Sequence, residues 1–258
     1  MFLNASEQTT WLPQQASTIA SEVDGLFYFI YYWTLFFLAI VVFCTFYFGW
    51  KYKNKGQKGL TSSNDHNTLL EVTWTAIPFV LVMIVFFWGA ESYMKMNVMP
   101  YGAMEVNVTA QKWSWNFKYK EGFSNPRELV VPVNTPVKLI MESQDVLHSF
   151  YVPEFRVKMD IIPNRYMLTW FEATKVGEFD IMCTEYCGAS HSEMLGKVIV
   201  KSQADYEAWL EKANVIDESI PLVEVGKTAY KRYACNTCHS IDGTSGTGPS
   251  LKGIWGTM

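Results

Sequence analysis

The chain has few histidines and cysteines, and those few are clustered. Among 258 residues there are four histidines and five cysteines. Only His66 and Cys44 lie outside patterns of the kind that bind metals or cofactors. The remaining seven are His148, His191, His239, Cys183, Cys187, Cys235 and Cys238. Ligand-type residues this scarce and this concentrated indicate metal or cofactor sites rather than scattered core positions.

Positive charge is also scarce. The 21 Lys and Arg residues against 25 Asp and Glu residues give a net charge of -4, so the chain lacks the basic excess that is typical of nucleic-acid binding. Residues 1–24 contain no Lys or Arg, and they therefore lack the basic segment of a secretory signal. The length of the chain leaves room for about two domains.

Charged residues are absent from two long apolar runs. Residues 25–50 and 72–90 carry no charged side chain. Since about 20 apolar residues cross a bilayer core as a helix, both runs are long enough to span a membrane and contact its lipid. The alternative, buried helices of a soluble core, fits such runs poorly. The predicted transmembrane hairpin covers residues 25–94, with spans at about 25–50 and 72–91 and a loop over 51–71.

The loop between the two runs carries lysines at positions 51, 53, 55 and 58. Positive residues concentrate in cytoplasmic loops, so we predict that this loop is cytoplasmic. Both termini are then extracytoplasmic, as are the N-terminal segment over residues 1–24 and everything after Met94. We expect the membrane to be the inner (plasma) membrane of a bacterium, with both termini on its periplasmic side.

The hydrophobic period changes to two after residue 103. Residues 112–119 alternate aromatic with polar side chains, which predicts a strand whose one face carries Trp113, Trp115, Phe117 and Tyr119. Many short strands separated by Pro and Gly predict an all-β sandwich or barrel over residues 95–201. Further β-type runs lie at 105–110, 128–131, 137–143, 149–152, 166–171, 177–183 and 197–200.

The stretch richest in ligand-type residues has the spacing Cys183-x3-Cys187-x3-His191-x2-Met194. Thiolates and thioethers are soft donors, which favour copper over magnesium, calcium or manganese. A mononuclear blue-copper site uses one Cys, two His and a weak axial Met; here a second Cys is present, so two sulfurs could bridge two metal ions. His148, at the start of a predicted strand, could supply a further donor, although a lone His there is more often structural.

Two other uses of this loop compete with copper. A disulfide between Cys183 and Cys187 is possible outside the cytoplasm, but it leaves His148, His191 and Met194 unexplained. Zinc accepts Cys and His at similar spacings, but a thioether is not a ligand of such zinc sites. Copper is the metal that suits the whole donor set.

The end of the chain predicts a helix, a linker and a second cofactor motif. Residues 203–213 are amphipathic at the helical period, and the helix and linker together cover residues 202–223. Cys235-x-x-Cys238-His239 is the attachment pattern of a c-type haem, in which two thiols bond the haem and the imidazole is an axial ligand. A chance motif or a redox dithiol is the alternative.

Together these features resemble subunit II of the haem–copper cytochrome c oxidases of the copper A type. The resemblance covers residues 25–201, and the loop over 183–194 is its most specific part. It implies a cupredoxin fold for residues 95–201 and a binuclear copper A centre. The implied ligands are Cys183 and Cys187 as bridges, His148 and His191 as terminal ligands, and Met194 and the backbone carbonyl of Glu185 as axial ligands.

The resemblance implies roles for three further groups. Trp113 matches the tryptophan through which electrons enter, and Glu71 matches a glutamate at the mouth of a proton-uptake path. The side chain of Glu185 would face a magnesium ion at the interface with subunit I. Taken by itself, Glu71 is better explained as a solvated charge at the end of a span, and the resemblance brings the two explanations level.

The segment over residues 224–258 resembles the beginning of a class I cytochrome c and predicts a partial all-α domain. The stretch from Gly248 to Gly253 resembles the loop that follows the haem helix in those proteins. Their axial methionine lies much further downstream, so we do not expect Met258 to be that ligand. The sixth haem ligand stays open, and we expect either a truncated sequence or a partner subunit that completes the pocket.

The predicted function is electron entry into a proton-pumping oxidase that reduces oxygen to water. Electrons would come from the fused haem c, from a separate cytochrome c or from a quinol-oxidising complex in a supercomplex. They would pass through copper A to the haems of subunit I, within an assembly that contains other oxidase subunits. The alternatives are a membrane-tethered copper carrier or sensor, which would have no need of a haem, and a relay to a different terminal reductase.

Overall fold

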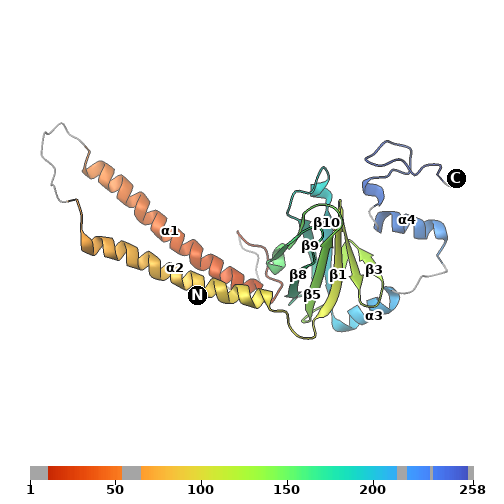
Figure 1. The fold of residues 1–258 in the computed structure, drawn as a ribbon, viewed down its shortest axis with the longest axis horizontal. Coiled ribbons are helices and arrows are strands. Elements are labelled where there is room, and N and C mark those ends of the chain that lie inside the picture. Colours follow the sequence, from red (N-terminus) through yellow and green to blue (C-terminus); the bar gives the residue numbers. More distant parts are fainter. Residues whose placement is uncertain (1–10, 54–64, 214–219, 233–234, 255–258) are drawn as a thin grey trace. The chain divides into compact units, whose positions relative to one another are not determined.

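The computed structural model describes residues 11–53, 65–213, 220–232 and 235–254. The chain divides into two compact units (Figure 1). One is the helical unit, Ser21–Lys95. The other joins the segment that ends at Ala20 to the chain from Met96 onwards.

Two long helices make up the helical unit: α1 (Ala20–Lys51) and α2 (Thr68–Asn97). Both are long and apolar enough to cross a membrane, and none of their apolar windows is buried within the chain. The helices extend beyond the predicted spans at both ends, because turns with charged side chains continue each apolar run. Most of the predicted cytoplasmic loop, including Lys55 and Lys58, lies outside the described residues.

The start of α1 packs against the end of α2. Gly25 permits this close approach, since a Cβ at that position would lie 3.3 Å from the indole of Trp88. About one helical turn from these two residues, the Glu22 carboxylate accepts a hydrogen bond from Ser92 at 3.2 Å and pairs with Lys95 at 2.9 Å. A small residue and a polar cluster therefore hold the antiparallel helices together at this end.

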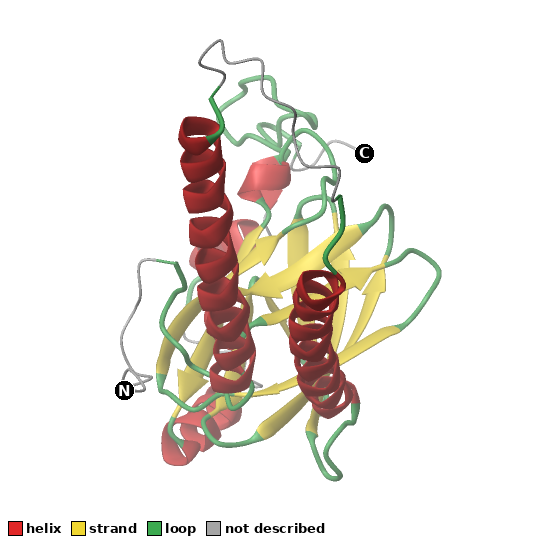
Figure 2. Ribbon diagram, turned by 90° about the vertical axis from the view of Figure 1, so that its left-hand side faces the viewer, coloured by secondary structure: helices red, strands yellow, loops and turns green. Residues whose placement is uncertain are grey.

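The second unit, which we call the β unit, contains two five-stranded sheets that face each other. Their strands are drawn in yellow in Figure 2. Their strand orders are β3-β2-β1-β5-β8 and β4-β10-β9-β6-β7. Neighbouring strands are antiparallel except for the parallel pairs β1–β5 and β4–β10. The strands are β1 (Met104–Gln111), β2 (Ser114–Tyr119), β3 (Ser124–Pro126), β4 (Glu128–Pro132), β5 (Pro136–Ser143), β6 (His148–Val152), β7 (Val157–Ile161), β8 (Met167–Glu172), β9 (Gly177–Cys183) and β10 (Leu195–Lys201). The predicted all-β sandwich is confirmed.

The core lies between the sheets and follows the period-two pattern of the sequence. Buried and less buried positions alternate along β5, and β2 supplies Trp115, Phe117 and Tyr119 to the core. Each predicted β run coincides with a strand to within two residues, but one expectation is wrong. β2 begins at Ser114, so Trp113 lies in the turn before the strand and not on its buried aromatic face.

Residues before α1 pack onto the β unit. Ser17 forms an isolated β-bridge with Ala173, and the amide of Ala16 donates to the Glu154 carbonyl at 3.0 Å. The guanidinium of Arg156 donates to the carbonyl of Pro13 at 2.6 Å. This segment therefore adds an edge to the sandwich immediately before the helical unit begins.

Helices follow the sandwich. α3 (Gln203–Ala213) places Trp209 against the rings of Tyr119 and Phe123, with centroids 5.4 and 5.5 Å apart. After it come α4 (Leu222–Arg232) and the 3-10 turn η3 (Cys235–Thr237). Residues 214–219 of the predicted linker, and Met258, lie outside the described residues.

Candidate metal centre

Strand pairing brings His148 next to the cysteine loop. β6 begins at His148 and runs antiparallel to β9, with Phe150 opposite Cys183. The start of β6 and the end of β9 therefore lie at the same end of the sheet. There the chain leaves β9, forms the loop over residues 183–194, which we call the ligand loop, and returns as β10. The histidine and the loop are 35 residues apart in sequence, and the sheet closes that separation.

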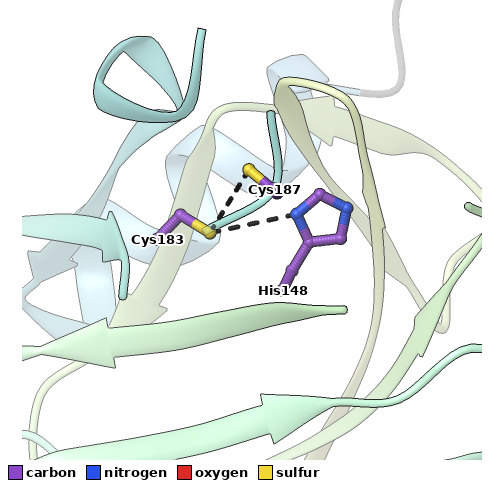
Figure 3. Close-up of side chains that lie close together, drawn as sticks. All are labelled: His148, Cys183 and Cys187. Carbon is purple, nitrogen blue, oxygen red and sulfur yellow. Dashed lines mark hydrogen bonds between the residues drawn. The ribbon is translucent and has the colours of Figure 1, made fainter. Parts of the chain in front are cut away.

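Three ligand atoms form a tight buried group (Figure 3). His148 Nδ1, Cys183 Sγ and Cys187 Sγ lie within 4.8 Å of one another. Cys183 Sγ is 3.8 Å from Cys187 Sγ and 3.9 Å from His148 Nδ1. Both cysteines are free thiols, so the structure does not contain the disulfide that the sequence left open.

The other predicted ligands surround the same two thiols. Cys187 Sγ lies 3.4 Å from His191 Nδ1 and 3.8 Å from Met194 Sδ. The thiol of Cys183 donates to the carbonyl oxygen of Glu185 at 3.3 Å. Two imidazoles, two thiols, a thioether and a carbonyl thus converge, and every residue that the resemblance implied as a copper ligand is brought to this place.

The donor set fits a soft metal ion. His148 and Met194 are 0% exposed, and Cys183 and Cys187 are 8% and 3% exposed. A thioether that faces thiols in a buried group suits copper, whereas zinc sites of this type use Cys and His alone. The four remaining donors beside the two thiols are enough to complete the coordination of two bridged ions.

Asp145 orients His148 and was missed in the sequence. Its Oδ1 lies 2.8 Å from His148 Nε2, and a hydrogen bond at Nε2 leaves Nδ1 as the nitrogen that faces the thiols. The same carboxylate accepts hydrogen bonds from the amides of Lys112 at 2.8 Å and Val146 at 2.6 Å. Asp145 therefore connects the His148 ligand to the turn that carries Trp113. Its position three residues before His148 is the only sequence signal that could have suggested it.

The two thiols differ in acidity because they are close neighbours. Burial alone would raise the pKa of Cys183, but hydrogen bonds from His148 and from the backbone of Ser149 lower it to about 6. Burial and the adjacent Cys183 thiolate raise the pKa of Cys187 to about 12. Without a cation, the pair is therefore expected to hold one negative charge, and a bound metal cation would favour ionisation of both thiols.

Trp113 lies directly on the ligand loop. A Cβ at Gly188, whose φ is +125°, would lie 3.2 Å from the indole ring, so only glycine permits this contact. Trp113 is partly exposed, and its Nε1 has no hydrogen-bond partner among the described residues. The indole therefore bridges the outer surface of the β unit and the loop between Cys187 and His191.

Glu71 belongs to the helical unit and caps α2. Its carboxylate accepts a hydrogen bond from the amide of Asn67 at 3.1 Å, while Asn67 Oδ1 accepts one from the amide of Leu70 at 3.1 Å. These reciprocal bonds satisfy amides at the start of the helix. The carboxylate of Glu71 thus has a structural role at the start of α2.

The Cys-x-x-Cys-His segment holds its histidine in a defined orientation. Nδ1 of His239 lies 2.8 Å from the carbonyl oxygen of Pro249, so this nitrogen is protonated and Nε2 is left as the ligand nitrogen. Gly248 lies beneath the ring, where a Cβ would come within 2.7 Å of the imidazole. Its amide donates to the carbonyl of Cys238 at 2.7 Å. An imidazole held by these contacts can serve as the axial ligand of a haem c.

A pair of apolar membrane-length helices and a β-sandwich with a buried Cys, His and Met cluster define a class: membrane-anchored cupredoxin-like proteins with a candidate metal site. Two family models match the chain. The model described as the transmembrane domain of cytochrome c oxidase subunit II matches residues 5–90, and the model of the periplasmic domain of that subunit matches residues 123–202. The chain belongs to the cytochrome c oxidase subunit II family.

Two relatives agree with this assignment, and one solved structure is also similar to part of the chain. Cytochrome c oxidase subunit 2 of Alkalihalophilus pseudofirmus is 33% identical over 83% of this chain and 66% of its own length. The alternative cytochrome c oxidase subunit 2 of Bradyrhizobium diazoefficiens is 33% identical over 68% of this chain and 74% of its own. The solved periplasmic domain of subunit II from Bradyrhizobium japonicum is 31% identical, covers 45% of this chain and 96% of that one, and has a TM-score of 0.43.

Membership of the family settles several sequence-based expectations. The chain is an integral membrane protein and a subunit of a haem–copper oxidase, an oxidoreductase complex in which it associates with other subunits. The family implies copper A, and the buried His148, Cys183 and Cys187 group is consistent with such a metal site.

Proposed function

We propose that this chain receives electrons from cytochrome c and passes them, through copper A, to the haems of subunit I of a proton-pumping oxidase that reduces oxygen to water. The observation that carries the proposal is the convergence of two thiols, two imidazoles, a thioether and a carbonyl in one buried group. Cys183 and Cys187 would bridge two copper ions, with His148 and His191 as terminal ligands. Met194 Sδ and the carbonyl of Glu185 would be axial ligands.

When bound, a thiolate-bridged copper pair accepts and releases a single electron that is shared by both ions. The chain's own contribution is to hold the ligands still. Burial of His148 and Met194 excludes water from the site, and Asp145 fixes the orientation of the His148 ring. Ligands that are held in one geometry keep the reorganisation that accompanies electron transfer small.

Trp113 would be the point of electron entry, because its partly exposed indole contacts the ligand loop at Gly188. We expect Trp113→Phe to slow reduction by cytochrome c severalfold in stopped-flow measurements, with the copper content unchanged. The smaller ring would retract from Gly188 while every ligand stays in place. Trp170→Phe, a change of the same type in β8, is the matched control and should leave the rate unchanged.

Loss of copper from the Trp113→Phe protein would mean that the indole is structural. An unchanged rate of reduction at full copper content would exclude Trp113 as the entry point. Because copper content and rate are measured on the same preparation, the two outcomes can be told apart.

We further propose that residues 224–258 carry a covalently attached haem c, bound through Cys235 and Cys238 with His239 as an axial ligand. The support is the hydrogen bond from His239 to Pro249 and the space that Gly248 leaves beneath the ring. The donor to this segment would be a cytochrome c or a quinol-oxidising complex, either free or in a supercomplex.

The remaining assignments complete the proposal. The chain would lie in a bacterial inner membrane with both termini on the periplasmic side, because the lysines between the helices favour a cytoplasmic loop. The Glu185 side chain would face a magnesium ion at the subunit I interface. Glu71 would stand at a proton-path entrance, a role that its bond to the Asn67 amide leaves open because a carboxylate has further acceptor sites.

A further inference from the structure

The segment around Met194 is held from outside the ligand loop by two side chains. Arg127 donates from Nη2 to the Glu193 carbonyl at 3.3 Å and from Nε to the Leu195 carbonyl at 3.4 Å. Trp115 donates from Nε1 to the carbonyl of Met194 itself at 3.3 Å. Three consecutive carbonyls are thus fixed by side chains from β2 and from the corner between β3 and β4. We name the pair Arg127 and Trp115 the methionine brace.

Trp115 is a rigid member of the methionine brace. Its side chain is 0% exposed, and its ring meets His148 and Phe150 edge to face, with centroids 6.4 and 5.8 Å away. The same indole therefore contacts one copper ligand, His148, and bonds the backbone of another, Met194. A buried aromatic ring in such contacts has no room to move independently of them.

Arg127 is anchored through its own backbone. It has a left-handed φ of 65°, its amide donates to the carbonyl of Trp115 at 2.9 Å, and its carbonyl accepts from the amide of Lys197 at 2.7 Å. Gly196 makes this approach possible, because a Cβ there would lie 2.8 Å from the Arg127 carbonyl oxygen. The backbone of Arg127 is therefore held between β2 and β10, and the guanidinium extends from that fixed position.

The methionine brace restricts the position of the Met194 thioether. Met194 ends the short 3-10 turn after His191 and precedes β10, and its Sδ lies 3.8 Å from Cys187 Sγ. The guanidinium, with donors in a planar fork, is suited to holding two carbonyls at once. Fixing the backbone on both sides of Met194 limits how far the thioether can move away from the thiols.

We propose that Arg127, acting with Trp115, is a positioning residue that sets the distance of the Met194 thioether from the metal centre and so tunes its reduction potential. This inference rests on the proposed copper site. An axial ligand tunes the potential of a copper–thiolate site. A weaker thioether contact stabilises the oxidised state less, so loosening the brace raises the potential.

The test is Arg127→Leu in the full chain, which removes the donors and keeps an apolar stem. We expect copper to be retained, the midpoint potential to rise, and the copper hyperfine splittings in the electron paramagnetic resonance spectrum to change. In the metal-free protein, amide hydrogen exchange in a peptide that covers residues 192–196 should accelerate by about tenfold, as the loss of one or two hydrogen bonds implies. Arg127→Lys, which can reach one carbonyl, should fall between wild type and Arg127→Leu.

Arg156→Leu is the matched control. Arg156 also has a left-handed φ, of 56°, and its guanidinium likewise donates to two carbonyls, those of Pro153 and Pro13. Pro13 belongs to the segment before α1, and Pro153 begins the short 3-10 helix Pro153–Phe155. Neither carbonyl belongs to the ligand loop. The control variant should lose stability in a similar way and keep the potential, the spectrum and the exchange rate at residues 192–196.

A wild-type potential, spectrum and exchange rate in Arg127→Leu would overturn the proposal, as would equal changes in Arg156→Leu. If Arg127→Leu does not fold, Arg127→Lys decides: a raised potential supports the proposal, and wild-type behaviour overturns it. If the wild-type chain itself binds no copper pair, the proposed function fails, while the exchange measurement on the metal-free protein still tests the brace.

Discussion

Replacing Cys183 by serine is expected to abolish electron transfer to oxygen while the proposed haem c stays reducible. Cys183 Sγ is close to His148, to Cys187 and to the Glu185 carbonyl at once, and a serine hydroxyl is neither a soft donor nor ionised at neutral pH. The copper pair should therefore be lost or reduced to a single ion. Oxygen uptake of the purified complex should fall to background. The absorption of the chain's own reduced haem should still appear, in excess of that of the added protein, when reduced cytochrome c is supplied as electron donor.

Cys44→Ser is the control for this result, because Cys44 lies in α1 within the helical unit. It should retain the wild-type copper content and oxygen uptake. Unchanged oxygen uptake in Cys183→Ser would contradict the ligand assignment. Loss of haem reduction together with oxygen uptake would instead place the copper site upstream of the haem.

The double change Cys235→Ser and Cys238→Ser is expected to remove covalently bound haem completely. Two thioether bonds are the only covalent attachment that the motif provides, since His239 contributes an axial bond alone. Haem staining of the denatured chain and its intact mass should both show the loss. The copper signal should persist, because the double change leaves every proposed copper ligand between His148 and Met194 in place.

Cys183→Ser is the reciprocal control, since it should keep the haem mass and lose the copper. A denatured wild-type chain that lacks the added mass of a haem after expression with haem-maturation factors would contradict the haem c proposal. The copper proposal would stand, because it depends on different residues.

The sequence predicted the parts of the fold that depend on local pattern. Charge-free runs predicted α1 and α2, and period-two alternation predicted the strands of the sandwich, since a run of apolar residues or a buried face leaves a direct trace in the residue order. β3 and β7 were missed. The three residues of β3 include a proline and are too few to show a pattern. β7, in contrast, alternates apolar with polar side chains from Val157 to Ile161, so the sequence could have predicted it.

The candidate site likewise has one part that the sequence reveals and another part that only the folded chain shows. The ligand loop is visible in the sequence because its four side-chain donors lie within twelve residues. His148 was a candidate for a further donor, and the resemblance implied its role as a terminal ligand. Asp145 lies three residues before His148 and could have been noticed. Arg127, in contrast, acts through contacts that only the folded chain creates, since its hydrogen bonds to Glu193 and Leu195 cross more than 60 residues. No local pattern marks such pairs.

The sequence pattern placed Trp113 in the wrong element. Alternation with Trp115 favoured a strand through both residues, but the chain turns at Lys112 and Trp113 before β2 begins. The Asp145 carboxylate, which accepts a hydrogen bond from the Lys112 amide, helps to hold that turn. From this turn the indole packs against the edge of the core and against Gly188 of the ligand loop.

The central claim is that Cys183 and Cys187 bridge two copper ions that share one electron. Electron paramagnetic resonance of the copper-loaded chain, with its metal content measured on the same sample, tests this most directly. We predict two copper ions per chain and a seven-line hyperfine pattern, since one unpaired electron is divided equally between two copper nuclei. A four-line pattern with one copper ion per chain would contradict the account.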